Sequence, residues 1–214
     1  MNKLGLFGGT FNPIHNGHLR AAEEITRQAR LEKILFIPSY IPPHKEQRCV
    51  APAGHRLAML RLALAGQKQF IPSAIEIEDR QTSYSIYTLR KIKKLYPEKE
   101  PFFIIGIDAF LEIRTWKDYE RVLEESNFFV LSRPGFALQE VQKVLPGKWQ
   151  AKTTWLNEGH FPSPRYSIFL VEINALPISA SEIRERVRQG KSITGLVPKE
   201  IENYIYQHHL YQDA

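Results

Sequence analysis

The sequence predicts an α/β protein with a doubly wound, mostly parallel sheet and a small helical cap at its C-terminus. Three observations support this prediction. Short apolar runs alternate with segments of helical periodicity, a glycine-rich turn separates the first run from the first helical segment, and two helical segments follow the last run. Because parallel strands need crossover connections, which are usually helices, this alternation is typical of the fold class.

Six apolar runs have the length of buried strands. We expect strands at 3–7, 33–37, 70–77, 102–105, 128–131 and 168–173. Between these runs, apolar residues recur at the helical period. The corresponding helices are expected at 17–30, 54–65, 84–95, 118–125 and 138–144.

The pattern changes after the last predicted strand. Helices are expected at 179–189 and 198–207, joined by a glycine-bearing loop at 190–197. Ser179 and Glu182 have the spacing of a capping box, and Gly190 would end the first of these helices. Residues 146–164, with three prolines and two glycines, have the composition of a long surface excursion. We therefore expect one domain, 1–214, in which 178–211 form a C-terminal helical subdomain.

Composition narrows the class of protein. The 214 residues are 43% hydrophobic and 24% charged, which suffices for one core. The sequence has no apolar run long enough to span a membrane and does not begin like a secretory signal, so no membrane partner is expected. The single cysteine, Cys49, favours a reducing compartment, and we expect a cytoplasmic protein. The net charge of +6 suits anionic ligands such as phosphates, and charge alone also allows nucleic acid.

Residues 8–18, called the signature turn below, connect the first predicted strand to the first predicted helix, where open α/β sheets bind ligands. Gly8 and Gly9 let the backbone approach a ligand closely, and a helix that starts near Asn16 offers N–H groups to phosphate. His15 would lie just before this helix and His18 in its first turn. Both imidazoles could then donate to one phosphate chain.

Three other interpretations of the signature turn compete. A zinc site would need at least a third ligand in helical register. A dinucleotide-binding turn would need the G-x-G-x-x-G spacing, which these residues lack. A structural glycine turn with incidental histidines stays open on these residues alone.

The signature turn, Gly-Gly-Thr-Phe-Asn-Pro-Ile-His-Asn-Gly-His, resembles that of the nucleotidyltransferase superfamily with the H-x-G-H motif, which includes class I aminoacyl-tRNA synthetases and small adenylyltransferases. Later segments resemble the bacterial nicotinate-nucleotide adenylyltransferase family in order and spacing. These segments are 42–45, 83–89, 106–108, Trp116, 133–135, 178–184, 197–198, 204–205 and 210–211. The resemblance covers nearly the whole chain.

The resemblance implies transfer of AMP from ATP to the 5′-phosphate of nicotinate mononucleotide, which yields deamido-NAD and pyrophosphate. The attacking phosphate oxygen is already ionised at neutral pH, so placement and charge stabilisation are the main tasks of the protein. Mg²⁺ is expected as the cofactor, bound to the ATP phosphates and not to protein side chains. The expected partners are these small substrates and not nucleic acid, and the chain could be a monomer or a homodimer.

The resemblance also implies the site residues. The catalytic set is His15, His18, Lys45, Ser181 and Arg184. The residues that bind ATP are Gly8, Gly9, Thr10, Phe11, His15, His18, Gly106, Asp108, Ile178, Ser181 and Arg184. The residues that bind nicotinate mononucleotide are Gly9, His44, Lys45, Ser85, Thr88, Trp116, Lys117 and Arg133.

Several of these residues have an expected role. Trp116, which could also be a core residue, would stack on the pyridine ring. Backbone N–H groups of Ser85 and Lys117 would hold the pyridine carboxylate, although Lys117 stands where an aromatic residue occurs in the family. Asp108 could cap the next helix or accept a hydrogen bond from a ribose hydroxyl.

Other functions remain as alternatives. The nearest are adenylyltransferases for nicotinamide mononucleotide or for phosphopantetheine. A cytidylyltransferase would carry a different helix motif, and a class I synthetase would need a longer chain. From another class, a nucleotide-sensing or RNA-binding module could keep this fold without catalysis, and its nucleic-acid affinity would fall steeply with salt.

Overall fold

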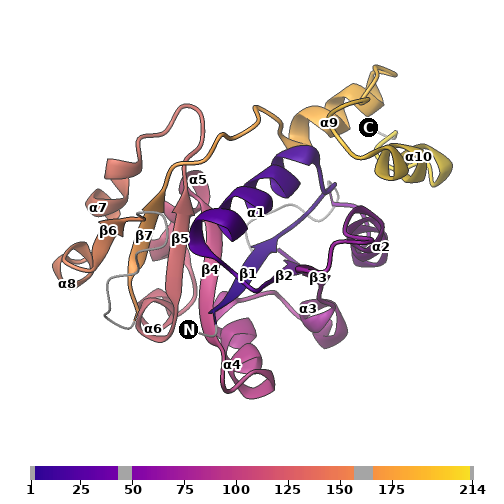
Figure 1. Ribbon diagram of the computed structural model, residues 1–214. Coiled ribbons are helices and arrows are strands. Elements are labelled where there is room, and N and C mark those ends of the chain that lie inside the picture. Colours follow the sequence, from indigo (N-terminus) through magenta and orange to yellow (C-terminus); the bar gives the residue numbers. More distant parts are fainter. Residues whose placement is uncertain (1–2, 43–49, 157–165, 213–214) are drawn as a thin grey trace.

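The computed structural model describes residues 3–42, 50–156 and 166–212. Its centre is a seven-stranded sheet with the order β3-β2-β1-β4-β5-β7-β6, in which every pair of neighbours is parallel (Figure 1). The strands are β1 (Lys3–Gly9), β2 (Lys33–Pro38), β3 (Phe70–Pro72), β4 (Glu100–Gly106), β5 (Asn127–Leu131), β6 (Thr153–Trp155) and β7 (Ile168–Val171). The predicted doubly wound α/β fold is confirmed.

Helices cover both faces of the sheet. One face packs against α1 (Asn16–Ala29) and α2 (Ala53–Ala63), and α9 (Ala180–Arg188) and α10 (Lys199–Gln207) extend the same apolar core beyond the sheet (Figure 1). The other packs against α4 (Ser85–Leu95), α5 (Ile107–Phe110), α6 (Tyr119–Glu125), α7 (Val141–Val144), α8 (Gly147–Gln150) and the short 3-10 turns η2 (Ile113–Thr115) and η3 (Leu138–Glu140). All the long helices that the periodicity predicted are present.

The strands are apolar on both faces because both faces are covered. In β4, Phe102 and Ile104 belong to the core on the α1 side, whereas Phe103 and Ile105 belong to the core on the α4 side. Successive side chains of a strand point to opposite faces, so a strand covered on both sides becomes a continuous apolar run. The predicted strands were recognisable for this reason.

The predicted strand at 70–77 is wrong in its second half. The strand β3 ends at Pro72, and residues 75–79 form a short helix, α3 (Ile75–Asp79). Proline has no backbone N–H to continue a ladder, and the Ser73 hydroxyl accepts a hydrogen bond from the Ile75 N–H at 3.4 Å, which turns the chain. The alternation of isoleucine and acidic residues at 75–79 imitates a strand.

The expected surface excursion at 146–164 is wrong for the part that the structure describes, 146–156. This segment contains α8 and β6, Trp149 is only 2% exposed, and β6 pairs with β7. The elements are too short for periodicity to be detected. The same reason explains why the four-residue helix α5 was not predicted.

The C-terminal helices α9 and α10 lie beside each other at one end of the molecule (Figure 1). Gly190, at φ 64°, follows α9 and ends it as predicted. The loop before α10 reaches α1, because the Asn16 N–H donates to the Leu196 carbonyl at 2.9 Å and the Asn16 side chain donates to the Gly195 carbonyl at 2.8 Å. The cap thus holds the start of α1. Among the described residues, no helix is long and apolar enough to cross a bilayer.

Candidate active site

The candidate site lies where the strand order of the sheet reverses. The first strand, β1, has β2 on one side and β4 on the other, and the chain leaves β1 and β4 in opposite directions across the sheet. In open α/β sheets, ligands bind in the crevice outside the carboxyl ends of such strands. Gly9 and Gly106 are the last residues of these two strands, and Arg133 follows shortly after β5.

His15 and His18 lie side by side at the start of α1. His15 is the N-cap residue and His18 belongs to the first turn, as the sequence predicted. Their rings are stacked with centroids 3.6 Å apart. His15 is buried, whereas the ring of His18 is partly exposed and packs edge-on against Phe7 and Phe11. Two imidazoles are therefore held by apolar neighbours in a fixed position.

Burial decides the protonation of His15. It lowers the pKa of this histidine to about 3, and the positive charge of Arg133 adds to the shift. His15 is therefore neutral at neutral pH. The His15 backbone N–H donates to Nδ1 of His18 at 3.3 Å, so a neutral His18 carries its proton on Nε2. The pair offers N–H donors and not two cations.

Gly17, between the two histidines, is required by space. A Cβ at this position would lie 3.0 Å from Nδ1 and 3.1 Å from Cε1 of His15, and 3.6 Å from the Ile178 carbonyl oxygen. The ring of His15 thus lies against the start of α1, and a larger residue at position 17 would require this ring to shift. The same contact places the start of α9, just after Ile178, close to the start of α1.

The middle of the signature turn is tied to two other segments. Asn12 is buried, and the peptide bond between Asn12 and Pro13 is cis. The Asn12 side-chain oxygen accepts a hydrogen bond from the Ala51 N–H at 3.0 Å. The Asn12 carbonyl accepts another from Arg184 Nη1 at 2.9 Å. Arg184 of α9 therefore lies against the turn, where the sequence analysis expected a phosphate.

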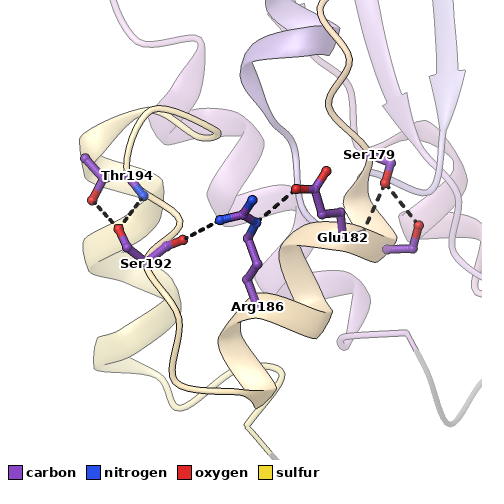
Figure 2. Close-up of polar contacts among 6 residues, drawn as sticks. Ser179, Glu182, Arg186, Ser192 and Thr194 are labelled. Carbon is purple, nitrogen blue, oxygen red and sulfur yellow. Dashed lines mark hydrogen bonds and ion pairs between the residues drawn. The ribbon is translucent and has the colours of Figure 1, made fainter. Parts of the chain in front are cut away.

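Ser181 lies in the first turn of α9, and Ser179 is the N-cap residue of this helix (Figure 2). The Ser179 hydroxyl accepts a hydrogen bond from the Glu182 N–H at 3.2 Å and lies 3.2 Å from the Ser181 hydroxyl. The predicted capping box is only half formed, because the Glu182 carboxylate accepts from Arg186 Nε at 2.9 Å. Arg186 also reaches the Ser192 carbonyl and so links α9 to the loop before α10. Ser181 stays exposed at the helix start.

Asp108 and Arg133 form an ion pair between the ends of β4 and β5. A Cβ on Gly106 would lie 2.5 Å from Oδ1 of Asp108, so this glycine allows the carboxylate to fold back over the strand end. The N-cap of α5 is Gly106, and Asp108 lies within the first turn. The alternative that Asp108 caps this helix is therefore wrong.

Ser85, Trp116 and Lys117 lie on the α4 side of the molecule. Ser85 is the first residue of α4. The Lys117 ammonium is exposed and lies 4.7 Å and 5.0 Å from the ring centroids of Tyr84 and Tyr87. A hydrogen bond with Tyr87 raises the pKa of Lys117. Trp116 is partly buried and makes an edge contact with Phe103. Part of its ring therefore packs against the core, and the rest is accessible to a ligand.

Thr88 is engaged within the fold. Its side chain is buried, and its hydroxyl donates a short hydrogen bond to the Glu76 carboxylate. Burial raises the pKa of Glu76, and this bond works against that shift. Thr88, which was expected to bind nicotinate mononucleotide, thus uses its hydroxyl to hold a carboxylate of α3. The expected ligands His44 and Lys45 lie outside the described residues.

One residue of this region was not predicted from the sequence. Arg56 of α2 is almost completely buried and contacts the carbonyl oxygen of Thr10 in the signature turn. A charged residue in a helical segment is expected at the surface, so the burial of Arg56 becomes visible only when the segments around it are brought together in the folded chain. Among residues 3–42, 50–156 and 166–212, no three histidine, cysteine or acidic side chains gather as a metal site.

Comparisons with known proteins agree with this architecture. The model of the cytidylyltransferase-like family matches residues 6–186. The chain is similar to a nicotinic acid mononucleotide adenylyltransferase from Plasmodium falciparum, complexed with NaAD, with a TM-score of 0.77 and 19% identity over 99% of this chain and 98% of that one. A putative nicotinate-nucleotide adenylyltransferase from Vibrio parahaemolyticus gives a TM-score of 0.68 at 17% identity over 100% and 98% of the two chains. These likenesses confirm the fold.

Sequence relatives identify the family. The chain is 42% identical to a probable nicotinate-nucleotide adenylyltransferase from Desulfatibacillum aliphaticivorans over 98% of this chain and 99% of the relative. It is 41% identical to a second one, from Syntrophotalea carbinolica, over 98% and 97% of the two chains. The resemblance inferred from the signature turn and the later segments is confirmed: the chain belongs to the nicotinate-nucleotide adenylyltransferases, which are nucleotidyltransferase enzymes of the cytidylyltransferase-like family.

Proposed function

We propose that this protein joins the 5′-phosphate of nicotinate mononucleotide to the α-phosphorus of ATP. A phosphate oxygen of the mononucleotide attacks, the bond from the α-phosphorus to the bridging oxygen breaks, and pyrophosphate leaves with the bonding electrons. The observation that carries this proposal is the stacked pair of His15 and His18 at the end of the signature turn, where the strand order of the sheet reverses. The membership of the chain in its family supports the same reaction.

The histidines would stabilise charge on the reacting phosphates. The nucleophile needs no general base, so the protein has to align two anions and neutralise the charge that develops between them. Because Nδ1 of His18 accepts from the backbone, this ring presents its Nε2–H group as a donor to the phosphates. Because the rings are held by packing before the substrates bind, little reorganisation is needed.

Ser181 and Arg184 would bind the pyrophosphate end of ATP. The Ser181 hydroxyl lies in the first turn of α9, where N–H groups and the helix dipole favour an anion. The Arg184 guanidinium uses one N–H for the Asn12 carbonyl, and its other donors suit phosphate oxygens. Asp108, beside Arg133, would accept from a ribose hydroxyl near Gly106.

The pyridine ring would bind on the α4 side. Trp116 would stack on it, and the N–H groups of Ser85 and Lys117 would hold its carboxylate. An amide in the same place would bring its own NH₂ toward these donors. This arrangement therefore favours the acid over the amide.

Mg²⁺ would enter this site bound to the phosphates of ATP. The Asp108 carboxylate near the signature turn is engaged by Arg133, and the remaining groups are N–H and O–H donors that suit phosphate and not a cation. An ion bound to the triphosphate with waters would neutralise phosphate charge. With its single cysteine, Cys49, the chain would work in a reducing compartment, and we place the reaction in the cytoplasm.

The test is pyrophosphate release with ATP and Mg²⁺, with nicotinate mononucleotide and nicotinamide mononucleotide compared at equal concentrations. We expect rapid release with the acid, much slower release with the amide, and deamido-NAD as the product. Equal rates would keep adenylyl transfer and contradict the carboxylate site. If pyrophosphate is released with phosphopantetheine and with neither mononucleotide, phosphopantetheine replaces nicotinate mononucleotide as the proposed substrate. If it is released with none of the three compounds, the proposal is contradicted.

A further inference from the structure

The arginine of α2 that the sequence analysis missed is an unusual buried group. Arg56 is 1% exposed, and its pKa is lowered by burial. Its guanidinium donates to three backbone carbonyls: Nε to Ala51 at 2.9 Å, Nη1 to Thr10 at 2.8 Å and Nη2 to Tyr40 at 3.1 Å. Burying a cation is costly, and an apolar side chain would fill the same core space more cheaply. The role of Arg56 must therefore lie in its three hydrogen bonds to the backbone and not in filling the core.

The three carbonyls belong to three separate segments. Thr10 lies in the signature turn, Tyr40 follows β2, and Ala51 comes shortly before α2. A planar guanidinium presents its N–H groups in a fixed fork, so it sets the positions of all three acceptors relative to one another. A lysine would keep the charge but could not reproduce this geometry. Arg56 thus joins the signature turn to the two segments beside it.

The same bonds continue to Arg184. Ala51 accepts from Arg56 through its carbonyl and donates through its N–H to the Asn12 side chain. The Asn12 carbonyl in turn accepts from Arg184. Positive charge from both arginines also acts on the buried phenol of Tyr211, whose pKa is raised by burial. The two guanidinium groups therefore lie in one connected network.

We propose that Arg56 is a positioning residue for adenylyl transfer, which sets the signature turn and, through Ala51 and Asn12, the guanidinium of Arg184. This inference rests on the proposed function. Arg56 is not expected to contact the substrates, because its side chain is 1% exposed and three of its five N–H groups already donate to backbone carbonyls. Its loss should act mainly on kcat, since a small displacement of aligned phosphates slows transfer more than it weakens binding.

The test uses Arg56→Lys and Arg56→Met, with Arg61→Lys and Arg61→Met as controls at an exposed position of the same helix. Circular dichroism first establishes the folded fraction and the melting temperature. Pyrophosphate release is then measured well below the melting temperature, per folded molecule. We expect kcat to fall about 100-fold in Arg56→Met and about 10-fold in Arg56→Lys, while KM for nicotinate mononucleotide stays within about twofold. The Arg61 variants should match the wild type.

A double-mutant cycle examines the connection to Arg184. If Arg56 acts through Arg184, the losses of kcat in Arg56→Lys and Arg184→Lys will not multiply in the double variant. A merely structural role would lower the melting temperature of the Arg56 variants and leave kcat per folded molecule unchanged. Losses that multiply fully would overturn the route through Asn12.

Wild-type activity separates the two proposals. An inactive wild type overturns the proposed function and this inference with it. An active wild type together with folded Arg56 variants of normal kcat overturns the inference alone. If Arg56→Met does not fold, Arg56→Lys decides by the same criterion, because it keeps the cation and most of the side-chain stem.

Discussion

The two ends of the candidate site are built differently. At the end proposed to bind the phosphates, called the phosphate end below, His15, Asn12 and Arg56 are buried, and Asn12 and Arg56 form hydrogen bonds with backbone groups of other segments. At the pyridine end, Lys117 is exposed and Trp116 is half-buried, and each is held by contacts with aromatic rings. One end is rigid before any substrate binds, and the other is open to solvent.

This difference predicts that the phosphate end determines the rate of transfer and that the pyridine end selects the substrate. Groups that are held in place before the transition state lower the barrier, so changes at the phosphate end should reduce kcat. Groups at an open surface contribute mostly to binding, so changes at the pyridine end should alter KM and the preference between substrates. Five predictions test this division, beginning with the largest expected effect.

Replacing His18 removes a donor from the rigid end. We expect His18→Ala to lower kcat by about two to three orders of magnitude with little change in KM, which is the usual consequence of losing one transition-state donor. Steady-state pyrophosphate release measures both constants. His55→Ala is a suitable control, because His55 bonds to Tyr204 on α10 and not to the signature turn. A variant with normal kcat would remove His18 from the mechanism.

Gly17→Ala perturbs the same end without removing any polar group. The new Cβ would lie 3.0 Å from the ring of His15, so the ring must move, and we expect kcat to fall about 30-fold, within the range for small misplacements. Gly54→Ala is the matched control, since Gly54 is also the second residue of its helix and has open space beside it. Equal kcat in the two variants would show that His15 does not need its present position.

Part of the fold and of the site could be predicted from the sequence. The signature turn predicted His15, His18 and the location of the site, because residue spacing around a strand and a helix start determines local placement. Periodicity failed at Ile75–Asp79 and at β6, where short elements carry too few residues to show a period.

Contacts between distant segments were beyond prediction from a single sequence. The role of Arg56 depends on carbonyls at residues 10, 40 and 51, which come together only in the folded chain. The low pKa of His15 was missed for the same reason, because an imidazole near neutral pH is the expectation until its burial is known.

The low pKa of His15 predicts a loss of stability in acid. The folded state keeps His15 neutral down to about pH 3, whereas the unfolded chain protonates it near the ordinary value of 6.5. The unfolded state therefore binds more protons between these values, and stability falls as pH falls. We expect this histidine to cost about 2 kcal/mol between pH 6.5 and pH 5.

The measurement is urea unfolding at both pH values for the wild type and His15→Asn, which keeps a capping residue at the start of α1. Between pH 6.5 and pH 5, the free energy of unfolding should fall by about 2 kcal/mol less in the variant than in the wild type. Identical drops would mean that His15 is protonated in the folded state, contrary to the low pKa that its burial causes.

Trp116→Ala tests the open end. We expect KM for nicotinate mononucleotide to rise by about tenfold, within the range for loss of a stacking partner, while KM for ATP and kcat change little. Trp116→Phe keeps a ring and should restore most of the affinity. Equal weakening of both substrates, with a lower melting temperature, would instead assign Trp116 to the core through its contact with Phe103.

Lys117→Met should have the smallest effect and the most specific one. The ammonium lies over Tyr84 and Tyr87, next to the first residue of α4, where the N–H of Ser85 is proposed to hold the pyridine carboxylate. A cation there attracts an acid and is indifferent to an amide, but solvent screens it because Lys117 is exposed.

We therefore expect Lys117→Met to lower kcat/KM for nicotinate mononucleotide about threefold at low salt, to leave the value for nicotinamide mononucleotide unchanged, and to lose its effect at high salt. Lys94→Met, at the exposed C-terminal end of α4, is the control for the loss of one positive charge. Equal loss of activity with the acid and the amide would show that the side chain of Lys117 only packs on Tyr84 and Tyr87. Selection between acid and amide would then depend on the backbone N–H groups alone.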